Sequence, residues 1–196
     1  MIAVLLPPPL GRPSRLPALA DRLDAHGVSA VRPRIEGDEL PPHAARYVAR
    51  ASLEISRLAA PGTPVALVAE GDAGPLVGAV GAAQRAAHRP VLGYVLVDAL
   101  LPRPGGSTRA EIAASQSAEG AQASPAEPGE PPGYRTEHLP AVADWPDAPC
   151  GYLLTDPACA HLARLARMRG WPVRRTRPEE APEALAGLLR ELRGRG

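Results

Sequence analysis

The sequence contains no lysine, no asparagine and no phenylalanine, and aromatic residues make up only 3% of its 196 positions. All 22 basic residues are therefore arginines. A basic set made only of arginine is typical of a GC-rich genome, so we expect a bacterial source. Because aromatic side chains are so few, the core of a domain of this length must consist mainly of alanine, valine and leucine.

Long apolar runs, a strong net charge and a set of cysteines are also missing. The longest apolar run is far below the roughly 20 residues that span a bilayer, so we expect no membrane partner. The formal net charge is +1, and the arginines lack interleaved aromatic residues, which argues against nucleic-acid binding. Met1 leads directly into an apolar run, without the charged segment of a secretory signal. Cys150 and Cys159 form neither a disulfide framework nor a metal motif, so we expect a cytoplasmic protein with no metal and no cofactor.

The most informative stretch is 64–80, which reads PVALVAEGDAGPLVGAV. Its first part, 65–69, is apolar without alternation, which is typical of a strand buried on both faces of a parallel sheet. A turn of small residues follows at 70–74, and Pro75 is favourable in the first turn of a helix. The apolar residues after it recur at helical spacing. The stretch therefore predicts a strand, a tight turn and a helix.

Short apolar runs and amphipathic segments alternate along the rest of the chain. Strands are expected at 2–6, 28–31, 65–69, 93–97, 151–155 and 171–175. Helices are expected at 15–26, 43–59, 75–87, 107–117, 157–169 and 179–193, with Ser107 as a helix cap. This alternation predicts an α/β fold, with a single domain over 1–196 and helices on both faces of a mostly parallel six-stranded sheet. The polar, low-complexity stretch 119–133 predicts a flexible segment.

The turn after the third expected strand resembles the nucleophile elbow of the α/β hydrolases, in the form V-G-H-S-G-A-G-P-L. On this pattern, 68–69 take the V-G positions, Glu70 takes the histidine position and 73–76 match as they stand. The resemblance implies the strand order 2-1-3-4-5-6, among the several doubly wound orders that the alternation allows, and a reduced, partly flexible lid at 107–142. Three further segments are similar to those of a small actinobacterial-type group of α/β hydrolases: 93–107, 145–153 and 170–173.

The chain departs from this family at three parts of the catalytic machinery. Gly71 occupies the position of the nucleophilic serine. The residues after the last expected strand, 174–179, contain no histidine to act as general base. The loop after the first strand begins with Pro7, Pro8 and Pro9, which have no N–H to offer an oxyanion hole. The resemblance therefore implies a hydrolase scaffold without its usual chemistry.

The remaining candidates for catalysis are carboxylates near the same edge of the sheet. Asp98 ends the fourth expected strand, where catalytic acids gather in open α/β sheets, and the alternative is a carboxylate bonded to loop N–H groups. A register shift of one residue makes Asp72 a nucleophile of the dehalogenase or epoxide-hydrolase type, whereas its structural alternative is an acid that favours a helix N-terminus. Glu70 is a further acid or base if it is buried near the site, and otherwise a polar turn residue.

Histidine and ligand-contacting residues complete the candidate site. His138 follows the predicted flexible segment and is the histidine best placed to fold over a pocket, with a surface position as the alternative. His88 and His161 are expected at a helix end and on a helix face. The residues expected to contact a ligand follow the strands: Leu10, Gly71, Asp72, Asp98, Ala99 and Leu100.

Three functions are compatible with this pattern. The first is a pseudoenzyme of α/β-hydrolase type that binds a small, mostly apolar molecule or supports a non-hydrolytic step by the shape of its pocket. The second is an active ester or epoxide hydrolase whose relocated catalytic residues include Asp72 or Asp98. The third is an interaction subunit that uses the sheet as a rigid scaffold. The oligomeric state is not predicted.

Overall fold

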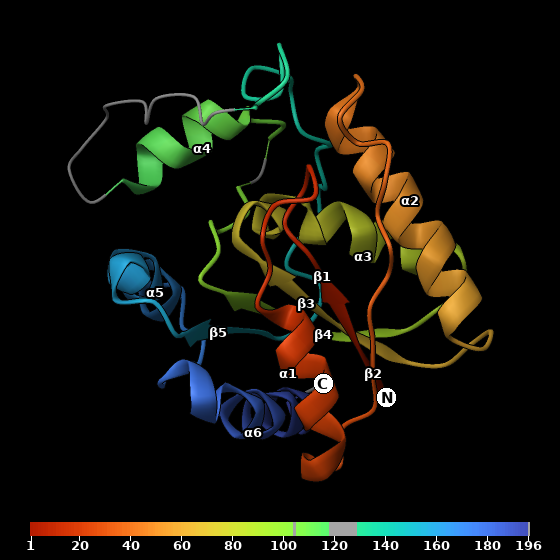
Figure 1. The fold of residues 1–196 in the computed structure, drawn as a ribbon, viewed down its shortest axis with the longest axis vertical. Coiled ribbons are helices and arrows are strands. Elements are labelled where there is room, and N and C mark those ends of the chain that lie inside the picture. Colours follow the sequence, from red (N-terminus) through yellow and green to blue (C-terminus); the bar gives the residue numbers. More distant parts are fainter. Residues whose placement is uncertain (104, 118–128, 196) are drawn as a thin grey trace.

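In the computed structural model, which describes residues 1–103, 105–117 and 129–195, six parallel strands form one sheet (Figure 1). Their order is β2-β1-β3-β4-β5-β6, so the predicted α/β class, single domain and strand order are confirmed. The strands are β1 (Ile2–Leu6), β2 (Ala30–Val31), β3 (Val65–Glu70), β4 (Val91–Val97), β5 (Cys150–Leu154) and β6 (Val173–Arg175).

Helices cover both faces of the sheet and produce three layers (Figure 1). Helices α1 and α6 pack on one face, and α2, α3 and α5 pack on the other. In the described part of the chain, the helices are α1 (Leu16–Leu23), α2 (His43–Leu58), α3 (Val77–Ala86), α4 (Arg109–Gln116), α5 (Ala160–Met168) and α6 (Ala181–Arg193).

The apolar strands of the sheet are buried from both sides. In β1, Ala3 and Leu5 pack towards α1 and α6, whereas Val4 and Leu6 pack towards the opposite helices. Every residue of β3 is buried. A strand covered on both faces has no solvent-facing side, which is why its sequence shows no polar alternation.

Several boundaries differ from the sequence predictions for local reasons. Strand β2 is only two residues long, and β4 begins at Val91, two residues before the predicted start. Helix α4 is capped by Thr108 rather than by Ser107. The Thr108 hydroxyl accepts the Glu111 N–H at 3.2 Å, and the Glu111 carboxylate accepts the Thr108 N–H at 2.8 Å. This reciprocal capping box needs a glutamate three residues after the cap, and Thr108 satisfies that spacing.

The elbow between β3 and α3 is a 3-10 turn, η2 (Gly71–Leu76), so the α-helix begins at Val77 rather than at Pro75. Within the turn, a Cβ atom added to Gly74 would lie 2.1 Å from the carbonyl oxygen of Leu100. Only glycine allows this close approach, which holds the elbow against the loop that leaves β4.

The predicted flexible stretch 119–133 lies outside the described residues as far as 128, and among its last residues Gly129, Pro132 and Gly133 lie in turns. Within the described ranges, no helix has both the length and the apolar character needed to cross a membrane.

Candidate ligand-binding site

A cavity of about 410 Å³ opens at the carboxyl end of the sheet, beside the elbow turn. This edge is where open α/β sheets bind their ligands, and the volume is within the range of small-molecule pockets. Gly71 and Asp72 reach it from the turn after β3, and Asp98 and Leu100 reach it from the loop after β4. The cavity therefore brings together four of the six predicted ligand-binding residues.

The two other predicted ligand-binding residues lie outside the described lining of this cavity. The N–H of Leu10 donates to Oδ2 of Asp38 at 2.8 Å. Ala99 is fully buried, and its carbonyl oxygen accepts the hydroxyl of Tyr152 at 3.2 Å. Both residues therefore stabilise the loops around the cavity.

Gly71 has a φ of +55°, in the left-handed region that favours glycine. Among the described residues, a Cβ atom built on it would meet only Cγ of Pro8, at 3.8 Å. The turn therefore has room for a side chain at Gly71, the position that the sequence resemblance assigns to the nucleophile.

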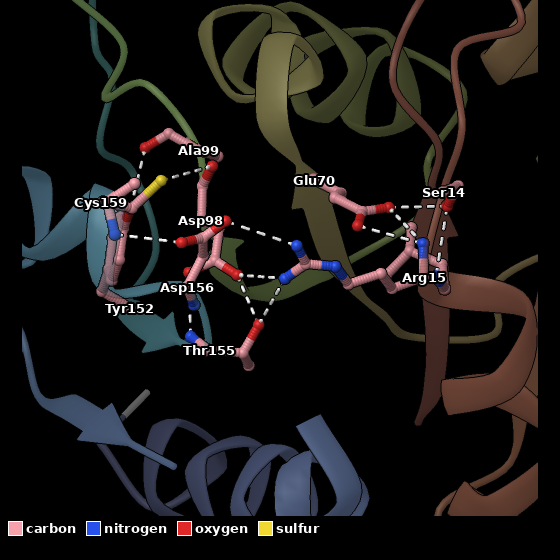
Figure 2. A network of polar contacts seen from close by, with 11 residues as sticks. Ser14, Arg15, Glu70, Asp98, Ala99, Tyr152, Thr155, Asp156 and Cys159 are labelled. Carbon is pink, nitrogen blue, oxygen red and sulfur yellow. Dashed lines mark hydrogen bonds and ion pairs between the residues drawn. The ribbon is translucent and has the colours of Figure 1, made fainter. Parts of the chain in front are cut away.

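Asp98 ties the ends of β4 and β5 together (Figure 2). Its Oδ1 accepts the N–H groups of Thr155 at 2.8 Å and Asp156 at 3.1 Å, and its Oδ2 accepts the Thr155 hydroxyl at 2.5 Å. The guanidinium of Arg15 also contacts Oδ2, at 3.4 Å. Among the described residues, no hydrogen bond joins this carboxylate to a histidine. Asp98 thus has the environment of a structural carboxylate bonded to loop N–H groups.

Glu70 is 8% exposed and holds the beginning of α1 (Figure 2). Its carboxylate accepts the hydroxyl of Ser14 at 2.6 Å and the N–H of Arg15 at 3.1 and 3.2 Å. A carboxylate at a helix N-terminus satisfies free N–H groups and is favoured by the helix dipole. Glu70, which the sequence resemblance places at a histidine position, therefore anchors the beginning of α1.

Asp72 forms an ion pair with Arg12, whose Nη1 lies 2.5 Å from Oδ2 of the carboxylate. The other terminal nitrogen of Arg12 contacts Glu130, which also pairs with Arg135. Burial of Glu130 opposes its ionisation, but the hydrogen bonds from Arg135 and Arg12 outweigh it and hold the pKa of Glu130 below its usual range. One wall of the cavity is therefore a network of paired charges.

The histidines lie in different places relative to the cavity. His138, the predicted candidate, is not among the described residues that line it, and its Nδ1 lies 2.7 Å from the carbonyl oxygen of Gly106. His161 does line the cavity, with its Nδ1 3.0 Å from the carbonyl oxygen of Ala158. The sequence favoured a surface role for His161 over one in the site, because a helical histidine without a motif is usually a surface residue.

Cys159 lines the cavity from the turn η3 (Pro157–Cys159), and its thiol donates to the carbonyl oxygen of Asp98 at 3.6 Å. Burial, with smaller effects of Asp98 and Asp156, raises the pKa of this thiol to about 11. Since the thiolate is the nucleophilic form, Cys159 is weakly reactive at neutral pH. Within the described ranges, no group of histidine, cysteine and acidic side chains is arranged to hold a metal ion.

Arg109 and Tyr134 are two further lining residues that the sequence did not reveal. Arg109 begins α4 and is only 5% exposed, and its guanidinium lies over the Tyr134 ring at 4.3 Å from the centroid. Among the described residues, none of its three guanidinium nitrogens has a hydrogen-bond partner, nor does the buried Tyr134 hydroxyl. Burial raises the pKa of Tyr134, so the phenol remains protonated and able to donate.

Comparison with known proteins finds similarity to solved structures, but not to protein families or curated sequences. No protein-family model matches the chain, and no curated protein sequence matches it. An extracellular α/β-hydrolase from a Paenibacillus species, described as a structural and functional homologue of tobacco salicylic acid binding protein 2, superposes with a TM-score of 0.61 at 13% identity, covering 98% of both chains. The pyrethroid hydrolase PytH has a TM-score of 0.62 at 16% identity over 95% of this chain and 96% of its own. A pyrethroid hydrolase from Sphingobium faniae has a TM-score of 0.53 at 18% identity over 99% and 97%. These likenesses show that the chain has the α/β-hydrolase fold.

Proposed function

We propose that this chain is an α/β-hydrolase-fold pseudoenzyme that binds a small, mostly apolar molecule in the cavity beside Gly71. The observation that carries the proposal is the combination of an empty nucleophile position and a retained cavity of about 410 Å³. Leu100, Ala113 and Leu162 supply an apolar part of the lining. An apolar lining with a few polar groups is the usual composition of a small-molecule site.

The loop after β1 supports the proposal that the chain does not catalyse acyl transfer. Pro7, Pro8 and Pro9 have no N–H, and the next N–H along the chain, that of Leu10, is taken by Asp38. The carbonyl oxygen of Pro7 accepts the hydroxyl of Tyr47 at 2.6 Å, which further fixes the loop. An oxyanion hole needs a free N–H aimed at the developing charge, and these residues supply none.

The reduced lid is part of the same proposal. Helix α4, Glu130 and Tyr134 all come from the predicted lid range 107–142 and line the cavity. We propose that the described parts of this range, 107–117 and 129–142, contribute the cover of the binding site.

An active hydrolase with relocated residues remains the competing function, and the contacts of its candidate carboxylates weigh against it. Asp72 is paired with Arg12, and Asp98 accepts from two N–H groups and a hydroxyl. A nucleophilic carboxylate must leave such partners before it attacks, and an activating base must lie beside the water that completes the reaction.

Two measurements test the proposal. The purified chain is first incubated with a fluorophosphonate probe and with p-nitrophenyl butyrate, and we expect neither serine labelling nor turnover above that of the heat-unfolded chain. Stoichiometric labelling, or turnover that Asp98→Asn abolishes, contradicts the absence of hydrolysis.

The second measurement tests binding, by screening small molecules for thermal stabilisation of the wild type and two variants. Ala113→Phe places a ring in the cavity, whereas Ala114→Phe changes the neighbouring residue of α4, which is not among the described lining residues. We expect ligands to stabilise the wild type and Ala114→Phe but not Ala113→Phe. Equal stabilisation of both variants excludes this cavity as the binding site.

A further inference from the structure

Arg109 carries a buried charge that the described protein does not neutralise. The residue is 5% exposed, and its Nε, Nη1 and Nη2 atoms are all buried without a hydrogen-bond partner. A lysine in this position would lose its proton, but a guanidinium remains charged inside a protein. Burial of an unpaired charge is strongly unfavourable. The position is therefore explained best by an anion that is not part of the described chain.

The local electrostatics make the placement of Arg109 still less favourable for the free protein. The residue follows the N-cap Thr108 in the first turn of α4, where the helix dipole disfavours a cation. A second guanidinium, that of Arg12, lies 5.6 Å from the centroid of the same Tyr134 ring. Cation–π contact with Tyr134 stabilises the face of the Arg109 guanidinium, but it leaves the N–H groups on its edge without acceptors.

The carboxylates around the cavity are already paired with other arginines. Asp72 pairs with Arg12, Glu130 pairs with Arg12 and Arg135, and Asp98 pairs with Arg15. Within the described ranges, no carboxylate forms an ion pair with Arg109. The Tyr134 hydroxyl is a second buried group in this part of the cavity without a partner.

We infer that the ligand of this cavity carries a carboxylate, which accepts hydrogen bonds from the edge of the Arg109 guanidinium and from the Tyr134 hydroxyl. This inference rests on the proposed binding function. Arginine presents parallel N–H groups that match the two oxygens of a carboxylate. Because its nitrogens are shielded in the ligand-free chain, binding includes a rotation of the Arg109 side chain towards the cavity.

A single negative charge fits the site better than two. The three carboxylates that line the cavity already have arginine partners, so the charge of Arg109 is left to be matched by a monoanion rather than by the dianion of a phosphate monoester. The cavity volume of about 410 Å³ limits the ligand to a small molecule, and the apolar lining at Leu100 and Leu162 accommodates a hydrocarbon body. The ligand class is therefore a small organic acid with an apolar body.

The experiment compares acids with neutral amides of the same skeleton by calorimetry on the full chain. The probes are octanoate with octanamide, 4-phenylbutanoate with 4-phenylbutanamide, and octyl phosphate as the dianionic comparison. We expect the wild type to bind the acids roughly 10- to 100-fold more tightly than the amides, as for hydrogen bonds to a charged group. Arg109→Gln and Tyr134→Phe should reduce this preference, with Arg109→Gln removing it and Arg109→Lys retaining a part.

The control is Arg164→Gln, which removes an exposed arginine of α5 and should leave the preference unchanged. Equal affinity of the wild type for acids and amides overturns the inference but leaves the binding function in place, and this comparison does not depend on any variant folding. An acid preference that survives in Arg109→Gln also overturns it, as does tighter binding of octyl phosphate than of octanoate. If neither acids nor amides bind at millimolar concentration, the proposed binding function fails as well.

Discussion

Replacing Arg109 with methionine should make the ligand-free protein more stable. Methionine keeps most of the apolar stem that packs beside Tyr134 and removes the charge. Exchanging buried ionic groups for apolar ones of similar size stabilises proteins by about 1–4 kcal/mol in favourable cases. Removal of a cation from the first turn of α4 adds about 0.3–1 kcal/mol. Loss of the cation–π contact with Tyr134 subtracts about 0.5–2 kcal/mol.

The balance of these effects is an increase of about 1–2 kcal/mol in the free energy of unfolding. For a chain of this size that corresponds to a rise in melting temperature of about 2–8 °C. The assay is urea unfolding followed by circular dichroism at neutral pH without added ligand, and unchanged slopes are needed to compare the two midpoints.

Arg169→Met is the matched control for this prediction. Arg169 also lies over an aromatic ring, that of Trp171 at 5.3 Å, but its Nη1 donates to the carbonyl oxygen of Pro102 at 3.0 Å. Because this guanidinium has a partner, its removal should destabilise the protein by about 1 kcal/mol. If Arg109→Met is destabilised as much as Arg169→Met, the guanidinium of Arg109 is already satisfied in the free chain and the reasoning is refuted.

Three further predictions concern the elbow and the titratable groups. Gly71→Ser should fold with a loss of about 1 kcal/mol in stability, because its φ is left-handed, and should show no measurable esterase turnover. Gly74→Ser should unfold at a much lower urea concentration, because its Cβ atom would meet the Leu100 carbonyl oxygen. Turnover by Gly71→Ser would show that a general base is present. Cys159 should react slowly with iodoacetamide at pH 7 and faster as the pH approaches 11, because burial raises the pKa of its thiol. The reaction is followed by mass spectrometry, and rapid modification at pH 7 would contradict this prediction. Glu130 has a lowered pKa in the folded state, so the stability it contributes is present above about pH 4.5 and is lost as the pH falls through the folded pKa. Glu130→Gln should therefore be less stable than the wild type at pH 7 and closer to the wild type at pH 3. A difference in stability that stays constant from pH 7 to pH 3 in urea unfolding argues against this linkage.

The alternation of strands and helices could be predicted from local sequence patterns. The unbroken apolar run in β3 indicated a strand covered on both faces, and the small residues after it indicated a sharp turn. These signals are short-range, because a buried strand and a glycine turn are specified by consecutive residues. The strand order was predicted from the resemblance carried by several segments, and the same resemblance assigned Gly71 to the position of the nucleophile.

The residues that surround the cavity could not be predicted, because distant segments of the chain bring them together. Arg109 and Tyr134 are 25 positions apart, and nothing in either local sequence distinguishes a buried, unpaired arginine from the solvated arginines elsewhere in the chain. Leu10 and Ala99 were predicted from their places after strands, but their backbone groups are taken by Asp38 and Tyr152. The partner of a polar group is set by contacts between distant segments, and these form only when the layers pack together.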